Sequence, residues 1–376
     1  MAYNLTTSTI PSMISAYLPP SLHPFLLLSY PLPPSGELLL EPLANGSSSV
    51  SSSGTLYGKG PLDAYFVLFW AVAFTALRWT TIHYLFSPIA RLLLPRLKAI
   101  KGQEREWNRA ERKREHVVLR FAEQGWSWLY CTVFWSFGYY VLTRFPNPTS
   151  PEQLWGTYPF HPLPGSLKFY YLAQLGWWFH QLLVINSEKR RKDHWQMFGH
   201  HILTIVLVVA SYAMNFTRVG VLIHCLMDFC DILLPFAKML RYMGCTTACD
   251  LAFVVFLVSW FLTRQVGLFL VILTTYRNAP AYIPHIWAPE KGMYFTRNAY
   301  VGFVALLGTL WCLATAWFYM ACVVAIRVVR GLGAEDSRSE EDEDESVEGE
   351  EVLEDVPQVV GTSSAVEQDG DVRKRR

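Results

Sequence analysis

Charge is scarce along most of this 376-residue chain, and its scarcity argues against a soluble globular protein. Only 17% of the residues are charged, whereas 52% are hydrophobic and 15% are aromatic. A single soluble core of this length would not bury so much apolar side chain. The composition therefore predicts a polytopic membrane protein.

Paired cysteines outside the apolar stretches are also lacking. Six of the seven cysteines fall within stretches that we expect to span the membrane, and Cys245 lies in a loop beside one of them. No disulfide framework is expected. The first 60 residues lack a basic stretch followed by a long apolar core, so they do not form a signal peptide.

Residues 1–60 are instead rich in Pro, Ser and Gly and show no periodicity, which is typical of a flexible leader. Asn4 and Asn45 each begin an N-x-[ST] sequon. Both are candidate glycosylation sites if this end of the chain is lumenal.

Seven apolar, aromatic-rich stretches follow the leader, and a helix needs about 20 such residues to cross a bilayer. The sequence thus predicts an all-α polytopic membrane protein with about seven transmembrane helices. The expected spans are residues 62–86, 124–143, 168–186, 198–214, 219–237, 249–275 and 299–326.

Positive charge gathers in two of the connecting segments. Residues 87–120 hold ten Lys or Arg against four Glu, and residues 187–194 add four more bases. Short loops rich in Lys and Arg remain in the cytosol. Seven spans then place the amino end in the lumen and the carboxyl end in the cytosol. Residues 96–120 are expected to extend as a charged helix, lying either on the membrane surface or in solvent.

The end of the chain is acidic, whereas the rest of the chain is basic. The last 42 residues hold 16 acidic and 5 basic side chains, whereas residues 1–334 hold 15 acidic and 27 basic ones. The tail is too polar to fold alone and is expected to be disordered. Ser337 and Ser339 adjoin its acidic run and are candidate phosphorylation sites; an unmodified solubilising tail is the alternative. The terminal RKRR is a candidate retrieval signal for the endoplasmic reticulum.

The chain therefore divides into four expected parts. These are a flexible lumenal leader over residues 1–60, a first transmembrane helix with a basic cytosolic loop over 61–117, a membrane domain over 118–328, and a disordered acidic cytosolic tail over 329–376.

Ionisable side chains inside the spans are functional candidates, because each costs about 2.5–3.5 kcal/mol at the centre of a membrane helix. His224, Asp228 and Asp231 are spaced i, i+4 and i+7, so they share one helix face. The preceding span opens with His200 and His201. Two imidazoles and three further polar groups thus fall on neighbouring helices.

The five residues 214–218 are long enough only for a tight hairpin between these two spans. In an antiparallel hairpin centred near Phe216, His201 lies at the depth of Asp231, and Thr204 lies at the depth of Asp228. We therefore expect the imidazoles and the carboxylates to meet on the cytosolic side of the bilayer.

Adjacent helical residues point about 100° apart, so His200 and His201 do not both face one partner. One histidine is expected to react, while the other orients it or binds substrate. A carboxylate that holds one ring nitrogen of a histidine would raise the basicity of its other ring nitrogen. One alternative is a purely structural set of polar groups that pins two helices together. Another is a zinc site built from the two histidines and an aspartate, although the spacing does not require it.

Several motifs over residues 168–242 resemble those of ceramide synthases, the longevity-assurance branch of the TLC-domain family. They are KFYYLAQLGWWFHQ (168–181), E-x-x-R-K-D from Glu188, M-x-x-H-H-x-x-T from Met197, S-Y-x-x-N-x-T-R-x-G from Ser211, and M-D-x-x-D-x-L-L-x-x-x-K from Met227. The Met-Asp pair is the fungal form of the last motif. The resemblance covers roughly residues 118–325, which identifies the membrane domain as a TLC catalytic domain.

The resemblance implies an acyl-CoA-dependent N-acyltransferase that forms (dihydro)ceramide from sphinganine or phytosphingosine in the endoplasmic reticulum membrane. It also implies that six helices form a TLC-type barrel around an intramembrane site, and it admits a homodimer or a heterodimer with a paralogue or a small regulatory subunit. No cofactor or metal is expected, since acyl-CoA is a co-substrate. A non-enzymatic TLC-type protein for lipid binding or translocation assistance, or an acyltransferase with another acceptor, is the alternative.

Within this framework, His200 is expected to attack the thioester, with Asp228 and Asp231 orienting the histidine pair and His201 or an aspartate taking the proton of the amine. Direct attack by the amine, with histidine acting only as a base, remains open. The expected substrate-binding residues are Arg190, Arg191, Lys192, Thr204 and His224.

Overall fold

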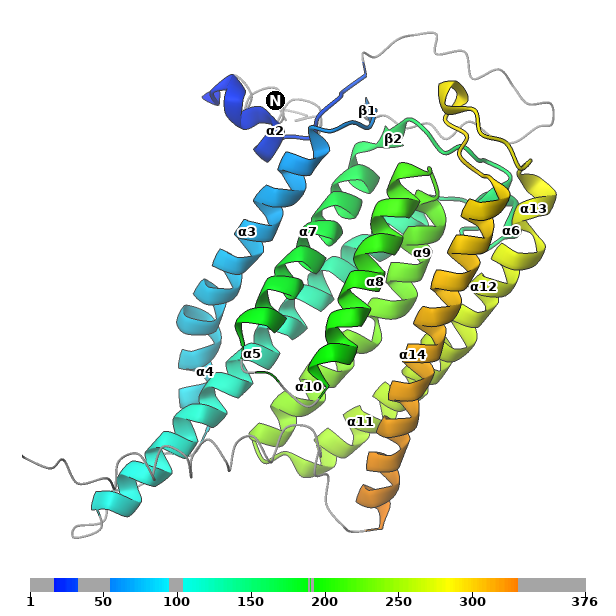
Figure 1. Cartoon of the computed structure of the whole chain (residues 1–376). Coiled ribbons are helices and arrows are strands. Elements are labelled where there is room, and N and C mark those ends of the chain that lie inside the picture. The colour runs from blue at the N-terminus through cyan, green and yellow to red at the C-terminus, as the bar shows by residue number, and fades with distance from the viewer. Residues whose placement is uncertain (1–16, 33–54, 95–103, 189, 191–192, 331–376) are drawn as a thin grey trace, which may run out of the picture.

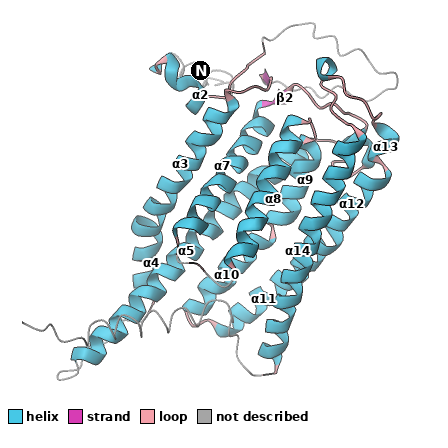
Figure 2. Ribbon diagram, viewed as in Figure 1, coloured by secondary structure: helices cyan, strands magenta, loops and turns pink. Residues whose placement is uncertain are grey.

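The computed structural model describes residues 17–32, 55–94, 104–188, 190 and 193–330, and its long helices lie side by side in a bundle (Figure 1). The described strands are confined to one short two-stranded ribbon at the upper end of the bundle (Figure 2). Several of the predictions above fall outside the described residues. They concern Asn4, Asn45, Arg191, Lys192, Ser337 and Ser339.

The described elements follow one another with short connections. The α-helices are α2 (His23–Leu26), α3 (Asp63–Thr81), α4 (Ser87–Leu93), α5 (Glu104–Thr143), α6 (Pro151–Trp155), α7 (Gly165–Ser187), α8 (His194–Ala213), α9 (Thr217–Asp228), α10 (Cys230–Tyr242), α11 (Thr246–Trp260), α12 (Leu268–Arg277), α13 (Ala279–Tyr282) and α14 (Arg297–Val329). The remaining elements are the 3₁₀ turns η1 (Pro20–Leu22) and η4 (Pro289–Lys291), the π-helical turns η2 (Ile82–Phe86) and η3 (Phe261–Gly267), and the strands β1 (Leu56–Tyr57) and β2 (Leu163–Pro164).

Within the described residues, five helical stretches are long and apolar enough to cross a membrane, which confirms a multi-pass membrane protein. The stretches predicted at 124–143 and 168–186 form the helices α5 and α7 of the same bundle (Figure 1). Trp, Tyr and polar side chains occupy many of their positions, so their mean hydropathy is lower. The five stretches are Asp63–Leu93, His194–Ala213, Thr217–Tyr242, Thr246–Tyr282 and Arg297–Val328.

The charged residues that precede the second predicted span are helical from Glu104 onward. They form the first part of α5, which continues without a break into the bundle. Arg91 of α4 forms an ion pair with Glu115 of α5, and the two side chains are about half exposed. From Glu104 onward, the basic segment is therefore a helical extension of α5 at the lower end of the bundle (Figure 1), whereas its residues 95–103 lie outside the described residues.

Two stretches of the expected leader fold onto the upper end of the bundle. β1 pairs antiparallel with β2, with Leu56 opposite Pro164. Lys168 is fully buried, lies 2.7 Å from the carboxylate of Asp63, and donates to the carbonyls of Ser29 and Gly58 at 2.8 and 2.7 Å. Strand pairing and the hydrogen bonds of Lys168 thus attach the described part of the leader to the bundle.

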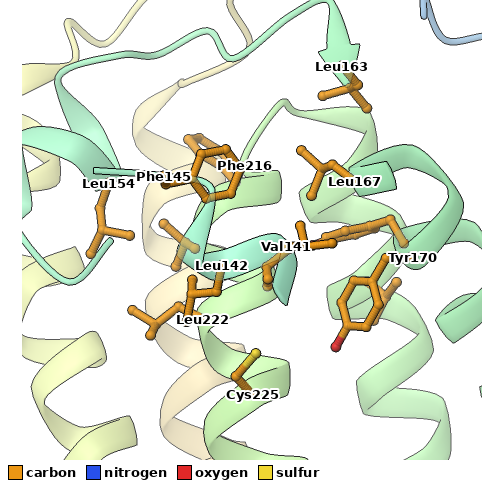
Figure 3. Packing of buried hydrophobic residues seen from close by; sticks show 14 of the residues in the cluster. Val141, Leu142, Phe145, Leu154, Leu163, Leu167, Tyr170, Phe216, Leu222 and Cys225 are labelled. Carbon is orange, nitrogen blue, oxygen red and sulfur yellow. The ribbon is translucent and has the colours of Figure 1, made fainter. Parts of the chain in front are cut away.

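Buried apolar side chains hold the bundle together in two main clusters. The upper cluster packs α5, α6, α7 and α9 against one another, and Figure 3 shows Leu142, Leu154, Tyr170 and Leu222 within it. The lower cluster packs α3, η2, α4, α5 and α7, and it includes Phe74, Phe121 and Trp177. The helices α8, α9 and α10 hold the polar residues predicted to form the site.

The tight hairpin predicted between two of the spans is confirmed. Helix α8 ends at Ala213 and α9 begins at Thr217, and Asn215 takes a left-handed conformation with φ of 65°. The second arm is not one straight helix, because regular α-helical structure is interrupted at Phe229, between α9 and α10. Pro235 lies six residues after Phe229 and donates no hydrogen bond to the carbonyl of residue 231, so the helical pattern is weakened again within α10.

Candidate functional site

A cavity of about 530 Å³ extends through the bundle among α5, α7, α8, α9, α10, α11, η3 and α14. Its lower end is lined by Asp193, Lys238 and Arg241, and its upper end by aromatic side chains that include Phe216 and Phe295. The cavity thus joins a charged mouth, on the side predicted to be cytosolic, to an apolar interior. The predicted residues His200, His201, Thr204, His224, Asp228 and Asp231 all line it.

The two adjacent histidines project from the first turns of α8 into an aromatic setting. The His200 ring lies edge-on to Trp317 of α14 at 5.1 Å and to Trp178 of α7 at 5.7 Å between ring centroids. The His201 ring also lies edge-on to Trp178, at 5.5 Å between ring centroids. Packing on Trp178 and Trp317 restricts the orientation of the His200 ring.

Hydrogen bonds assign the protons of His201. Its Nδ1 lies 2.6 Å from the backbone carbonyl of Met197, one turn earlier in α8. A carbonyl only accepts, so Nδ1 carries the proton and Nε2 holds the lone pair. Within the described part of the chain, Nδ1 of His200 is buried and has no hydrogen-bond partner.

The carboxylates lie in the same cavity but do not hydrogen-bond to the imidazoles. Asp228 accepts from Nε2 of Gln174 at 2.9 Å, and Asp231 forms an ion pair with Arg264 at 2.8 Å. The direct histidine–carboxylate bond expected from the hairpin register is therefore not the arrangement in the described structure. The register fixes the depth of a residue along a helix, whereas the rotation of each helix decides which side chains touch.

Gln174 is part of the site and was not found from the sequence. Its Oε1 accepts from the hydroxyl of Tyr130 at 2.8 Å, and its Nε2 also lies 3.1 Å from the hydroxyl of Tyr170. This buried network links α5 and α7 to Asp228 on α9. A glutamine within the span 168–186 is a weak signal, since amides in membrane helices usually join helices together.

Arg264 is the second residue that the sequence analysis missed. It lies in η3, lines the cavity and is 6% exposed. An arginine inside an apolar stretch is a clear signal of a functional position. Its partners on α9 and α10 are more than 30 residues away along the chain.

The other predicted binding residues have different surroundings. The Thr204 hydroxyl donates to the carbonyl of His200 at 2.9 Å, within α8. Nδ1 of His224 lies 2.8 Å from the carbonyl of Gly220, and its Nε2 is buried with no partner among the described residues. Arg190 is exposed and stacks on Trp195, 5.8 Å from the ring.

The described side chains form no group of three or more His, Cys, Asp and Glu residues that could hold a metal ion. The acidic partners of the histidines, Asp228 and Asp231, are engaged by Gln174 and Arg264. The site therefore places the adjacent His200 and His201 in one cavity with Asp228, Asp231 and Arg264, a set suited to proton transfer and acyl transfer.

Comparison with known proteins agrees with the sequence motifs. The family model described as a TLC domain matches residues 120–323. The chain is 38% identical to sphingosine N-acyltransferase lag1 of Schizosaccharomyces pombe, over 89% of this chain and 76% of that protein. It is 35% identical to ceramide synthase FUM18 of Gibberella moniliformis, over 77% and 70% of the two chains. It is 29% identical to ceramide synthase LAG1 of Saccharomyces cerevisiae, over 78% and 68%.

Proposed function

The chain belongs to the TLC-domain family, among its ceramide synthases, and we propose that the cavity around His200 and His201 is where it acts. It is a sphingosine N-acyltransferase, which transfers a fatty acyl group from acyl-CoA to the amine of a sphingoid base. The observation that carries the site assignment is the histidine pair, placed between a charged mouth and an apolar interior in one cavity.

His200 is the proposed nucleophile. Its ring is held between Trp178 and Trp317, and an imidazole nitrogen attacks a thioester carbonyl to give an acyl-imidazole. The proton of the imidazole passes to the departing CoA sulfur. Splitting the reaction in this way lets CoA leave before the amine arrives.

His201 is the proposed base for the second step. Its Nδ1 is held by the Met197 carbonyl, which leaves the lone pair of Nε2 to take a proton from the attacking amine. Asp228 and Asp231 stabilise positive charge that develops on the histidine pair. They act through the field in the cavity, since their own hydrogen bonds go to Gln174 and Arg264.

Acyl-CoA is proposed to enter from the lower end of the bundle. Lys238 and Arg241 line that mouth, and exposed Arg190 lies just before α8. Basic side chains there compensate the phosphates of CoA. Arg191 and Lys192, outside the described residues, belong to the same proposed basic group.

The acyl chain then lies along the apolar interior, beside Thr204 and His224. The aromatic side chains of the upper cavity, Phe216 and Phe295 among them, provide its apolar surroundings. An acyl chain placed in this way leaves its thioester carbonyl at the depth of the histidine pair. This agrees with a nucleophile at the lower end of α8.

The membrane arrangement proposed is seven spans, six of them forming a TLC barrel, with the amino end in the lumen of the endoplasmic reticulum. The basic segments 87–120 and 187–194 support the orientation. Asn4 and Asn45 would then be open to glycosylation, and Ser337 and Ser339 to cytosolic kinases. A dimer with a second copy, a paralogue or a small subunit fits the same arrangement.

Expression in membranes without endogenous activity tests the proposal. The protein is given sphinganine with acyl-CoAs of several lengths, and the products are identified by mass spectrometry. The wild type is expected to form dihydroceramide from at least one acyl-CoA, and His200→Ala is expected to form none. A folded wild-type protein that forms no N-acyl product, or an active His200→Ala variant, would contradict the proposed site.

A further inference from the structure

Arg264 is a buried guanidinium that the two steps described above leave without a role. It lies in the π-helical turn η3 and projects toward the interruption between α9 and α10. Its Nε and Nη2 donate to the carbonyl of Met227 at 3.1 and 2.5 Å, and Nη2 lies 2.8 Å from the carboxylate of Asp231. Its guanidinium carbon stacks 4.2 Å from the centroid of the Trp260 ring.

These contacts fix the guanidinium and leave part of it unused. The hydrogen bonds that Arg264 makes with the described residues involve Nε and Nη2, so the two N–H groups of Nη1 remain available. The residue also lines the cavity that contains His200 and His201. A fixed donor with spare N–H groups thus lines the same cavity as the histidine pair.

A structural role alone does not require a cation here. Arginine inside a membrane helix is costly, and a single carboxylate with 42% of its side chain exposed does not need a buried partner. π-Helical turns inside α-helices occur frequently at functional sites. The turn η3 places the charge of Arg264 in the cavity rather than toward lipid.

We propose that Arg264 is a further catalytic residue, whose Nη1 donates to the carbonyl oxygen of the acyl group as that oxygen becomes negative. This inference rests on the proposed function and completes its chemistry. Acyl transfer passes through tetrahedral intermediates, and preorganised donors aimed at the developing oxyanion supply a large part of the catalysis. Met227 and Asp231 hold the donor in place before the substrate arrives.

In this role Arg264 faces the acyl carbonyl oxygen in both steps of the reaction. In the first step, a His200 nitrogen bonds to the thioester carbon, the carbonyl electrons move to oxygen against Arg264, and the carbon–sulfur bond then breaks. The sulfur leaves with the proton that the imidazole loses. In the second step, the amine nitrogen bonds to the same carbon, the oxyanion again faces Arg264, and the His200 nitrogen leaves. The proton of the amine goes to His201 and passes from there to the departing nitrogen of His200, so both imidazoles are neutral again. The first step has released the CoA thiol, and the second releases the amide.

Substitution of Arg264 with measurement of both steps tests the inference. In Arg264→Ala, CoA release from acyl-CoA without amine is expected to slow by about 10²–10³-fold, and transfer to sphinganine by a similar factor. The KM for acyl-CoA is expected to change little, because the donor acts on the transition state. Arg264→Lys keeps the positive charge but loses the planar set of N–H donors of the guanidinium. A rate between those of wild type and Arg264→Ala is therefore expected.

Arg218 provides a matched control. It is 8% exposed and joins α9 to the segment around α6 through Gln153 and Thr157, but it does not line the cavity. Arg218→Ala is expected to lower the thermal midpoint in detergent. The rate of CoA release per folded molecule is expected to stay within about threefold of wild type, since no oxyanion donor is lost.

Chemical rescue separates catalysis from structure. Added guanidinium ion is expected to restore part of the rate of Arg264→Ala, and urea, its neutral analogue of similar shape, is not. Neither is expected to change Arg218→Ala. Folded Arg264→Ala with a wild-type rate, or a slow variant that guanidinium does not accelerate, would overturn the inference. The proposed function would survive either result if the wild type is active and His200→Ala is not.

Discussion

At the scale of single residues, the site separates its acidic groups from its imidazoles. Asp228 and Asp231 line the same cavity as His200 and His201, yet each carboxylate is bonded to a different helix. In the proposed mechanism the carboxylates therefore act on the histidines through charge rather than by fixing their tautomers. The tautomer of His201 is fixed instead by the carbonyl of Met197.

Asp231→Asn is expected to reduce turnover while the protein remains folded. The substitution keeps the shape of the side chain but removes the negative charge that stabilises positive charge on the histidine pair and on Arg264. A loss of about 2–3 kcal/mol in transition-state stabilisation slows the reaction by roughly 30- to 160-fold. Dihydroceramide formation per folded molecule measures the effect, and a rate within threefold of wild type would remove Asp231 from the mechanism.

Gly220 supports the site through a close approach between α9 and α7. A Cβ atom at this position would lie 1.7 Å from the hydroxyl of Tyr171, which is 2.5 Å from the hydroxyl of Ser211. Gly220→Ala is therefore expected to displace a buried tyrosine and to destabilise the fold by about 1–3 kcal/mol. The thermal midpoint in detergent provides the measurement.

Gly302→Ala is the matched control for that substitution, because a Cβ at Gly302 in α14 meets nothing within 4 Å. Alanine is the better helix former, so this variant is expected to be as stable as wild type or more stable by about 0.5–1 kcal/mol. Equal effects of the two substitutions would show that the contact between Gly220 and Tyr171 is unimportant.

At the scale of elements, the upper end of the bundle is joined to the amino-terminal segment by two lysines, the buried Lys168 and the partly buried Lys59. Lys59 donates to the carbonyl of Tyr212 at 2.6 Å and to the side chain of Asn215 in the hairpin. Burial, with the like charge of Lys168 adding to it, lowers the pKa of Lys59 to about 7. The folded protein therefore favours neutral Lys59, whereas the unfolded chain keeps the ordinary value of 10.5.

The stability contributed by this contact is expected to rise with pH. Below about pH 7, both states bind the proton and the cost of burying the charge is fully present. Above that value only the unfolded state retains the proton, so the cost falls as the pH rises toward 10.5. Lys59→Gln removes the titrating group.

Thermal midpoints of wild type and Lys59→Gln at pH 6 and pH 9 measure this effect. The difference between the two proteins is expected to shift in favour of wild type at the higher pH. Lys291→Gln, which changes an exposed lysine near the same end, is expected to give the same difference from wild type at both values. A pH-independent difference for Lys59→Gln would contradict the assignment.

The same elements show which features of the fold the sequence predicts and which it does not. Hydropathy, loop charge and residues 214–218 predict the helices, the hairpin and the depth of the histidines. They do not predict how far each helix is rotated. The contact of Asp231 with Arg264 depends on how the two helices that carry these residues are rotated against each other, and a single sequence does not give that rotation.

At the scale of the whole molecule, the charged mouth of the cavity and the basic segments lie at the same end of the bundle. The first part of α5, the start of α8 and the end of α10 all meet there (Figure 1). This arrangement requires the lower end to be cytosolic, where acyl-CoA is found. The proposed mechanism therefore depends on the orientation of the chain in the membrane as well as on the site.

The orientation predicts that a tag at the amino end is protected from protease in sealed microsomes and that a tag at the carboxyl end is cleaved. Protein expressed in the endoplasmic reticulum is expected to lose mass on endoglycosidase treatment if Asn4 or Asn45 is glycosylated. A protease-accessible amino-terminal tag would contradict the orientation. Absence of glycosylation alone would leave it standing.

In the proposed mechanism, His200 carries the acyl group between the two substrates. Purified active protein incubated with acyl-CoA and no amine is expected to release about one CoA per active site and to gain the mass of one acyl group. Peptide mapping is expected to place that group on His200, and His200→Ala is expected to show neither event. An active preparation that releases no CoA before the amine is added, and shows no adduct by intact mass, would contradict the covalent route.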